Sequence, residues 1–578
     1  MKNILSTSKL KLSLLVMGMT LTLFGCSEFL DVEPKDIFTD DNYWTSESNV
    51  KTYSWSYYNT FNGYGDGTGT TSEFYFHEPL NFDDNLSHRT FTTFNTQATT
   101  TNRDWNSYYT LIRRANLMLE RIPSVPMDQA KKNHYTGVAK FFRAYTYFRL
   151  VQQFGNVPYS EEYLGQNDPN VYKPALNRAE VIDKAIKELE EATTLLLDSE
   201  EKNVTVNKFT AYTVLSSVCL YEGTYRKYNL AQNGDVYFQK AKTASLGVMN
   251  NAKYKLNADW KALYNSVELL DNSEVILTKR YLKGTLMHSL QNYTNTSTVQ
   301  NGLTKFAAES YVTINGLPIK QVANAQYLGD ATISNTFANR DPRFAKAFSN
   351  VDYGYSDKVF TGGIYSNTGY IIQLYNNPAT TGTDVTTGGQ NYTDAPVFTL
   401  SEVLLNYAEA CAELGTVTNA DLDKSINLVR TRAGIAKLTT DGTNASANGI
   451  AIIDPQRTSS LEALTGVVNP IIWEIRRERR VEFMTWTYLR QADILRWKKG
   501  DYLDSAKNPD VFLGARVTAL IGNTTAKTKV DANGYIIPYV GVSRVFISPK
   551  HYLRAIPTND IQLYKAEGVD LIQNKGWE

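Results

Sequence analysis

The chain has 578 residues and a formal net charge of zero, because 59 lysines and arginines balance 59 aspartates and glutamates. That length allows several core units, and the balanced charge gives no electrostatic reason to expect nucleic acid or an anionic lipid surface as a partner. The 38 tyrosines suit wet binding surfaces, since each ring has an apolar face and a polar tip, although most of them are expected to fill core.

Residues 1–25 have the pattern of a secretory signal. Positive charge at its start comes from Lys2, Lys9 and Lys11. The uncharged run over residues 12–25 falls short of the roughly 20 apolar residues that a membrane-spanning helix needs. Residues 23–26 read LFGC and resemble a bacterial lipobox, in which the cysteine thiol takes a diacylglyceryl group. We therefore expect Cys26 to anchor the mature chain to a membrane; a plain signal peptide with an incidental cysteine is the alternative.

The spacing of apolar residues predicts long helices over residues 129–155 and 177–197. One face of the first helix carries Val138, Phe141, Phe142, Tyr145 and Phe148. The second begins with Asn177 and Glu180, which form an Asn-led version of the capping box.

Two later stretches look alike. Residues 214–223 (VLSSVCLYEG) and 406–415 (NYAEACAELG) each have small residues in the middle, then a cysteine and a final glycine that is expected to end the helix. Each is followed by another amphipathic segment, at residues 235–249 and 422–434. Helix pairs with small residues where they cross suggest tetratricopeptide-like repeats, separated here by long insertions.

Four stretches lack sustained helical periodicity and are rich in Gly, Asn, Thr, Asp and Tyr. They are residues 61–104, roughly 280–400, 436–470 and 500–555. Loops of that size in a compact protein are usually functional or disordered, and their aromatic content argues against disorder. The expected fold is mostly α: a tetratricopeptide-like helical repeat scaffold with a large irregular, loop-rich half.

No cofactor or metal site is indicated. The five histidines are scattered, and no Cys/His cluster has metal-ligand spacing. Cys219 and Cys411 are interpreted as two buried thiols, and a single bridge between them stays open. Residues 531–534 (DANG) begin like a calcium loop but lack its closing glutamate, so we expect a turn and leave calcium binding open.

Seven segments in order resemble the RagB/SusD family. They are FLDVEPKD (29–36), FFRAYTYFRLVQQFGNVP (141–158), YAEACAELG (407–415), INLVRTRAG (426–434), IRRERRVEF (475–483), ADILRW (492–497) and the C-terminal YLRAIPTNDI…LIQNKGW (552–577). The resemblance covers essentially the whole mature chain. The lead into the sixth segment departs from the family, with Thr487 and Tyr488 standing where a Gly-Arg or Glu-Arg pair is usual.

The resemblance implies a lipoprotein at the outer surface of a Gram-negative bacterium. It implies a signal over residues 1–25 and one body over 26–578, with a repeat-rich part at 26–260 and a loop-rich part at 261–578 that contains a helix pair near 400–435. The implied activity is capture of oligosaccharides, or another nutrient such as peptide. The body would act as the lid of a SusC-like TonB-dependent transporter in the outer membrane, with the helical scaffold facing it.

The competing class is a surface-anchored glycoside hydrolase, for which the sharpest candidates are Glu478 and Glu482. They lie one helical turn apart, and a glycosidase needs two carboxylates about 5–10 Å apart. Arginines crowd the same stretch, and Glu474/Arg477 and Arg479/Glu482 have the spacing of ion pairs. Arginines keep carboxylates ionised, whereas a catalytic acid needs a raised pKa. A structural ion-pair network is therefore expected, and no enzyme.

The expected glycan site pairs aromatic rings with polar side chains. Two irregular stretches offer that mixture. The first supplies Tyr75, His77, Asp83, Asp84, Asn85 and Arg89, and the second Tyr281, His288 and Tyr293. Should these fail, the loops of residues 352–395 are the next choice. Trp44, Trp105 and Trp486 lie in helical patterns and are expected in the core.

Overall fold

The computed structural model describes residues 43–61, 63–65, 83–88, 91–165, 168–198, 201–295, 301–322, 324–350, 366–525 and 528–578. Of the predicted anchor and ligand-binding residues, Cys26, Tyr75, His77 and Arg89 lie outside these ranges. Most of the regular structure is helical, and the strands in the described part form only small sheets of two or three. No helix in the described ranges is long and apolar enough to cross a membrane.

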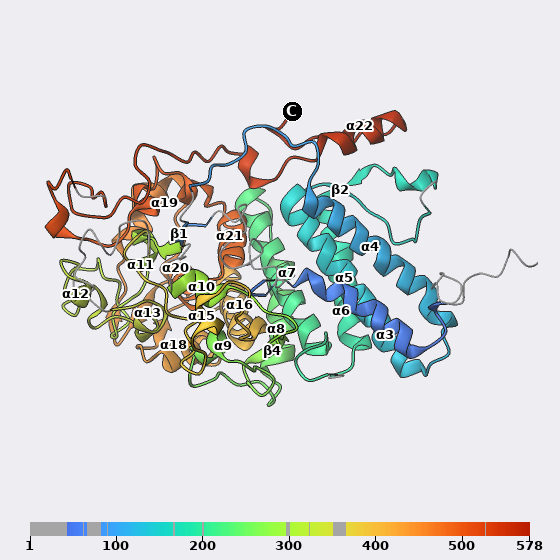
Figure 1. The fold of residues 1–578 in the computed structure, drawn as a ribbon, viewed down its shortest axis with the longest axis horizontal. Coiled ribbons are helices and arrows are strands. Elements are labelled where there is room, and N and C mark those ends of the chain that lie inside the picture. The colour runs from blue at the N-terminus through green and yellow to red at the C-terminus, as the bar shows by residue number, and fades with distance from the viewer. Residues whose placement is uncertain are drawn as a thin grey trace, which may run out of the picture.

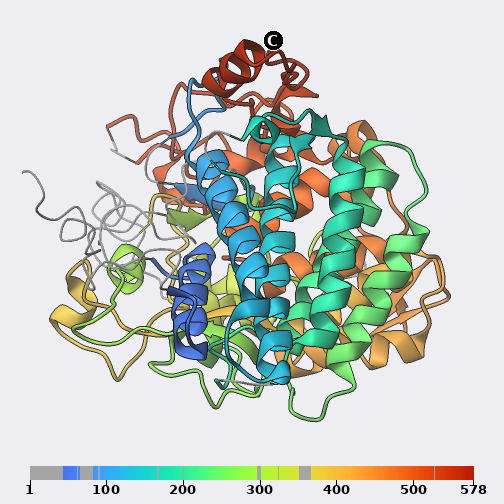
Figure 2. The same ribbon diagram turned by 90° about the vertical axis from the view of Figure 1, so that its right-hand side faces the viewer.

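One side of the molecule is a stack of long helices (Figures 1 and 2). Its members are α3 (Glu47–Trp55), α4 (Arg103–Arg121), α5 (Gln129–Phe154), α6 (Arg178–Leu195), α7 (Lys208–Asn229) and α8 (Asp235–Met249). From α4 to α8 each helix packs against the next, and α16 (Leu400–Glu413) returns from late in the sequence to pack on α7 and α8. The mostly helical repeat scaffold is confirmed.

The helix boundaries follow local signals. The side chain of Asp128 accepts the Lys131 amide at the start of α5, and Gly155 ends that helix with a φ of 72°. The Asn177 side chain caps α6 by accepting the Ala179 amide. The expected capping box, in which the Glu180 side chain would accept the Asn177 amide in return, does not form. A complete capping box starts α7 instead, between Asn207 and Thr210.

Gly223 does not end its helix, as the sequence pattern suggested, because α7 continues to Asn229. Its role is a close helix crossing. A Cβ at Gly223 would lie 2.6 Å from the Phe238 ring of α8, and one at Gly234 would lie 2.4 Å from the Gly223 carbonyl oxygen. The two glycines therefore let α7 and α8 approach at the turn that joins them. Gly415, the other glycine that was expected to end a helix, does so with a positive φ just after α16.

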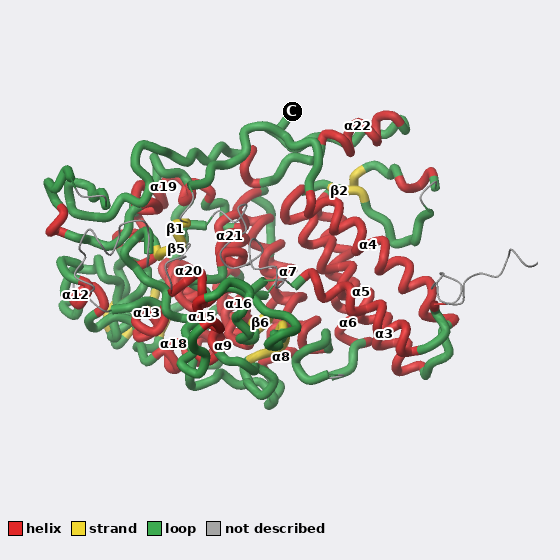
Figure 3. Tube along the Cα trace, in the orientation of Figure 1, coloured by secondary structure: helices red, strands yellow, loops and turns green. Residues whose placement is uncertain are grey.

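The other side of the molecule is dominated by loops (Figure 3). Its short helices are α9 (Ala262–Asn265), α10 (Leu290–Asn295), α11 (Lys305–Ala308), α12 (Ile333–Phe337), α13 (Pro342–Ala347), α15 (Thr383–Thr386), α17 (Asn419–Asp423), α18 (Ile426–Ala433) and α19 (Ser460–Thr465). Two longer helices, α20 (Pro470–Glu482) and α21 (Thr487–Arg496), run through it, and α22 (Thr558–Ala566) lies back against the scaffold. The expected helix over 422–434 is thus split between α17 and α18.

The strands tie distant segments together in antiparallel pairs. β1 (Leu86–His88) pairs with β5 (Asn301–Leu303), β2 (Val157–Pro158) with β3 (Ala175–Leu176), and β4 (Val275–Lys279) with β6 (Ala395–Thr399). A small meander joins β7 (Leu438–Thr440), β8 (Ala445–Ala447) and β9 (Ile450–Ala451). The β1–β5 and β4–β6 pairs each join segments of the loop-rich side that are more than 100 positions apart.

Two hydrophobic cores meet at α16. Leu400, Val403 and Leu404 belong to the scaffold core, whereas Leu405 and Tyr407 belong to the core of the loop-rich side. Every residue of α16 is buried, as expected of a helix that is packed on all faces. α16 therefore joins the two halves of the molecule.

Several expectations about single residues are confirmed here. Trp44, Trp105 and Trp486 are buried in the cores. Cys219 and Cys411 are free buried thiols, one in each core. Residues 531–534 form a turn in which the Asp531 carboxylate accepts the backbone amides of Asn533 and Tyr535, at 2.9 and 2.8 Å.

Candidate functional site

The charged side chains of α20 form a buried ion-pair network. Glu478 lies 2.9 Å from Arg430 and 2.6 Å from Arg343, and Glu482 lies 2.8 Å from Arg343. Arg432 also contacts Glu482. Both carboxylates are at most 2% exposed, so neither can flank a sugar bond, and the structural interpretation of this pair is confirmed.

Two other expected pairs on α20 have different outcomes. Glu474 and Arg477 form the expected ion pair at 3.1 Å. Arg479 does not pair with Glu482, because Glu482 is taken by arginines from other segments. It pairs with Asp493 of α21 at 2.8 Å.

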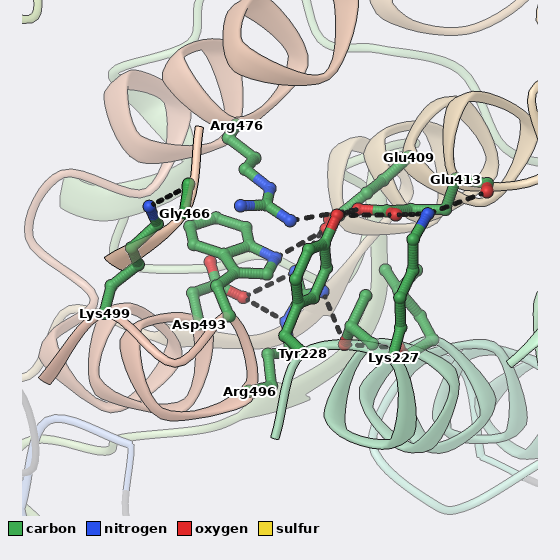
Figure 4. A network of polar contacts seen from close by, with 12 residues as sticks. Lys227, Tyr228, Glu409, Glu413, Gly466, Arg476, Asp493, Arg496 and Lys499 are labelled. Atoms are coloured by element: carbon green, nitrogen blue, oxygen red, sulfur yellow. Dashed lines mark hydrogen bonds and ion pairs between the residues drawn. The ribbon is translucent and has the colours of Figure 1, made fainter. Parts of the chain in front are cut away.

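A second charged network connects α7, α16, α20 and α21 (Figure 4). The Arg496 guanidinium donates to both oxygens of Glu409 at 2.7 Å. Glu413 accepts from Arg476 at 3.0 Å and from Lys227 at 2.8 Å. Burial acts to raise the pKa of Glu409, but the arginines, Arg496 first, outweigh it and hold that pKa at about 2. Glu409 is therefore an ionised anchor of the fold, and Glu413 joins α16 to α7 and α20.

The described residues of the first predicted glycan stretch are buried anchors as well. Arg490 donates two hydrogen bonds to Asp84, at 2.7 and 2.8 Å, and Arg480 lies 3.1 Å away. The Asn85 amide donates to the Met484 carbonyl at 2.9 Å. Asp83, Asp84 and Asn85 are at most 2% exposed. Their burial favours a role in holding the chain over contact with a ligand.

The second predicted stretch is also largely interior. Tyr281 and His288 pack with Tyr64, and Tyr64 packs on Tyr375. The Tyr281 hydroxyl donates to the Gly65 carbonyl at 2.7 Å and accepts the Tyr64 amide at 2.8 Å. Burial lowers the pKa of His288 to about 3, so this ring is neutral. Tyr293, on α10, is the most accessible described residue of the predicted set, at intermediate exposure.

The first stretch contacts the chain that links α20 to α21 directly, and the second is connected to it through Tyr64 and Tyr375. Asn85 contacts Met484, and the Tyr375 hydroxyl donates to Thr485 at 2.8 Å. Tyr264, which accepts the Tyr64 hydroxyl at its carbonyl, packs against Trp486. Whether any of the nine named residues touches a ligand stays a prediction.

A cavity of about 100 Å³ lies between the scaffold and the loop-rich side. Its walls include Tyr145, Phe148, Tyr221, Tyr488, Glu402 and Asn406. A water molecule occupies about 30 Å³ in the liquid, so the cavity has room for a few waters and none for a sugar ring. Burial raises the pKa of Glu402, while Arg479 partly offsets this. This junction cavity is too small to be the glycan site.

A larger surface pocket of about 450 Å³ lies among α9, α10 and α15, which are labelled close together in Figure 1. Its lining residues are Lys261, Gln291, Gln373, Asn376, Asn377, Pro378, Thr380 and Val385. Ligand sites usually have volumes of about 300–1,000 Å³. Side-chain amides both donate and accept hydrogen bonds, which suits the hydroxyls of a sugar. We call this site the amide pocket.

Hydrogen bonds hold the walls of the amide pocket in place. Asn265 donates to the Asn376 carbonyl at 2.8 Å, and Asn377 donates back to the Asn265 carbonyl at 2.7 Å. Gln291 donates to the Tyr375 carbonyl at 2.8 Å and accepts from Thr380 at 3.2 Å. The loop over residues 373–380 is therefore fixed to α9 and α10 before any ligand arrives, which lowers the entropy lost on binding.

Sequence reasoning located the amide pocket only in part. Gln291 lies inside the second predicted stretch without having been singled out, and residues 373–385 lie in the loops that were the next choice. Lys261 was missed altogether, because nothing in its local sequence separates it from an ordinary surface lysine. A concentration of Gln and Asn at 373, 376 and 377 is the signal that could have pointed to the pocket.

The fold is that of a helical-repeat scaffold carrying a loop-rich side with a polar pocket, and known proteins share it. The family model described as "SusD family" matches residues 273–577, which is more than half of the chain, and a second model, "Starch-binding associating with outer membrane", matches residues 28–220. The chain belongs to the SusD family.

Individual relatives are distant. SusD-like protein P38 of Formosa agariphila is 27% identical over 40% of this chain, a match that spans only 44% of P38. SusD-like protein P2 of the same organism is 24% identical over 69% of this chain and 72% of its own length. A crystal structure of a SusD-like carbohydrate-binding protein from Bacteroides fragilis is 21% identical, with a TM-score of 0.68 over 90% of this chain and 99% of its own. That likeness concerns the fold.

Proposed function

We propose that this protein captures a glycan at the outer surface of the outer membrane and passes it to a SusC-like TonB-dependent transporter, on which it acts as a lid. The observation that carries the proposal is the amide pocket, a preformed polar site on a SusD fold. Cys26 anchors the body through lipid, and the helical scaffold faces the transporter.

Three further observations support a protein that binds a glycan and does not hydrolyse it. The Glu478/Glu482 pair is buried in arginine contacts. The family model over residues 28–220 is described as starch-binding and associated with the outer membrane. The Bacteroides fragilis neighbour is described as carbohydrate-binding. A scaffold that binds peptide at the same pocket is the alternative, and glycans are favoured because amide side chains match sugar hydroxyls.

Binding is tested with the soluble fragment of residues 27–578, first on a glycan array and then by calorimetry with the ligand that the array finds. Gln373→Ala removes a lining amide and should weaken binding about tenfold, the effect of losing one or two hydrogen bonds. Gln456→Ala, at a half-buried glutamine outside the pocket, is the matched control and should bind as the wild type does. If the protein bound peptides and no glycan, the peptide-binding alternative would replace the glycan proposal.

The transporter partnership has its own test. Full-length protein carrying an affinity tag is purified from detergent-solubilised outer membranes of its native host. We expect a TonB-dependent transporter to co-purify in equal amount. Recovery of the tagged protein without a transporter, under conditions that keep other outer-membrane complexes intact, would contradict the proposal that it acts as a transporter lid.

A further inference from the structure

We propose that the amide pocket selects an acidic sugar, one that carries a carboxylate or a sulfate group, and that Lys261 is its charged contact. This proposal rests on the proposed function, since it names the class of glycan that the same pocket takes.

Among the described residues that line the pocket, Lys261 is the only one with an ionisable side chain. The other seven lining residues are amides, Pro378, Thr380 and Val385. A single cation among neutral hydrogen-bonding groups gives the pocket a positive electrostatic potential. This potential strengthens the binding of an anionic ligand and does not strengthen the binding of a neutral one.

The Lys261 ammonium has no partner among the described residues. Lys283, by contrast, lies 2.7 Å from Asp384, which precedes the lining residue Val385. Partial burial lowers the pKa of Lys261, and Asp259 only partly offsets this. A half-buried ammonium without a counter-ion is costly, and an anion on the ligand would supply what is missing.

Asp384, the carboxylate beside Val385 in sequence, does not compete for Lys261. Its Oδ2 accepts from Lys283 at 2.7 Å and from the Tyr392 hydroxyl at 3.3 Å. Among the described residues that line the pocket there is no carboxylate, and the nearby Asp259 accepts the Lys261 backbone amide at 3.1 Å.

Gln373 provides the complementary neutral contact. Its amide nitrogen donates to the carbonyls of Ala345 at 2.6 Å and Phe348 at 3.2 Å. These bonds fix the side chain and leave its carbonyl oxygen available to accept a hydroxyl. An acidic sugar can thus place its anionic group on Lys261 and a hydroxyl on Gln373, so that one charge and one hydroxyl are recognised together.

The test uses the fragment of residues 27–578 and an array that holds neutral, carboxylated and sulfated oligosaccharides, among them neutral galactan, oligogalacturonate and sulfated galactan. We expect binding to charged glycans and little to their neutral counterparts; whether oligogalacturonate or sulfated galactan binds identifies the anionic group. Calorimetry with the bound glycan should show an affinity that falls as NaCl is raised, since salt screens the contact.

Substitutions distinguish a direct contact of Lys261 with the glycan from a general effect of the protein's net charge on binding. Lys261→Gln should weaken binding of the charged glycan about tenfold, as expected for a charge-assisted hydrogen bond. Lys261→Arg keeps the charge and should bind within a few-fold of the wild type. The matched control is Lys187→Gln, at an exposed lysine on α6, which should change nothing. Equal melting temperatures exclude a folding defect.

The experiments give different results depending on whether the acidic-sugar proposal fails alone or glycan capture fails with it. A neutral glycan bound equally well by the wild type and Lys261→Gln would overturn the acidic-sugar proposal while leaving glycan capture in place. Failure to bind any glycan on the array would overturn both. A charged glycan whose affinity is unchanged in Lys261→Gln would place the anionic contact elsewhere and also contradict the proposal.

Discussion

Asp84 and Arg490 form a two-pronged ion pair, with oxygen–nitrogen distances of 2.7 and 2.8 Å, in the interior of the protein. Asp84 belongs to an early loop and Arg490 to α21, so the contact joins parts of the chain that are 406 positions apart. Arg480 of α20 approaches the same carboxylate at 3.1 Å. One buried anion therefore fixes a loop to two helices.

Asp84→Asn should destabilise the protein by about 3–5 kcal/mol, because it leaves two buried guanidinium groups without their counter-ion. The midpoint of urea unfolding measures the loss. Asp570→Asn, at an exposed aspartate, is the control and should change stability by less than about 0.5 kcal/mol. An Asp84→Asn variant as stable as the wild type would mean that the ion pair contributes nothing net.

Asp83, next in sequence, should make stability depend on pH in the opposite sense to most carboxylates. Burial, the largest cause, raises the pKa of Asp83 from 3.8 to about 6, and the backbone amides of Leu86 and Asn85 offset this only in part. A raised pKa in the folded state gives stability that is fully present below pH 3.8 and is lost as pH rises through 6.

The measurement is the free energy of unfolding of the wild type and of Asp83→Asn from pH 4 to pH 7. As pH rises, the free energy of unfolding of the variant should increase relative to that of the wild type. The increase should be about 3 kcal/mol at most, since each pKa unit is worth about 1.4 kcal/mol. The nearby Arg544 favours the ionised form, and its effect is already part of the pKa of Asp83. A difference that stays constant over this range would show that Asp83 has an ordinary pKa.

Local sequence signals predicted the scaffold well and the pocket poorly. α5 begins and ends within a residue of its expected limits because Asp128 and Gly155 cap it from within the segment itself. Glu478 was recognised as structural because its arginine neighbours are visible in the same helix. For α5 the deciding contacts lie within one turn, whereas the actual partners of Glu478, Arg343 and Arg430, lie on other segments and were not predicted.

The features that sequence reasoning missed depend on distant partners. Asp84 and Tyr281 have the residue types of a sugar site, and only the fold shows that Arg490 and Tyr64 bury them. Lys261 is distinguished by what is absent around it, which no local pattern reveals. Gly223 was expected to end a helix, whereas contact with Gly234 and Phe238 decides its role.

Gly234→Ala should destabilise the α7–α8 hairpin by several kcal/mol, because the new Cβ would lie 2.4 Å from the Gly223 carbonyl oxygen, a backbone atom that cannot move aside cheaply. Gly165→Ala is the matched control, since nothing lies within 4 Å of a Cβ built there. It should leave the melting temperature unchanged or raise it slightly. Equal melting temperatures for the two variants would show that the crossing adapts.

Glu478→Gln tests whether the arginine network is structural. It removes the counter-ion of Arg430 and Arg343 and should destabilise the protein by about 3 kcal/mol or more. We expect the wild type to release no product from any polysaccharide that it binds, as measured by reducing-end assays. Turnover by the wild type that disappears in a folded Glu478→Gln variant would establish catalysis and refute the binding proposal.

Cys26→Ala should abolish membrane attachment while leaving the folded body unchanged. Each buried methylene of an acyl chain is worth about 0.8 kcal/mol, and two or more chains give stable anchoring, so the loss of one thioether removes the whole attachment. The measurement is incorporation of radioactive palmitate and the partition of the protein between membrane and soluble fractions. Cys219→Ala is the control: Cys219 is a free thiol with no exposed surface, and its replacement should leave the palmitate label in place. Palmitate that persists on Cys26→Ala would locate the anchor at another residue, whereas its loss together with an unchanged glycan affinity would separate anchoring from binding.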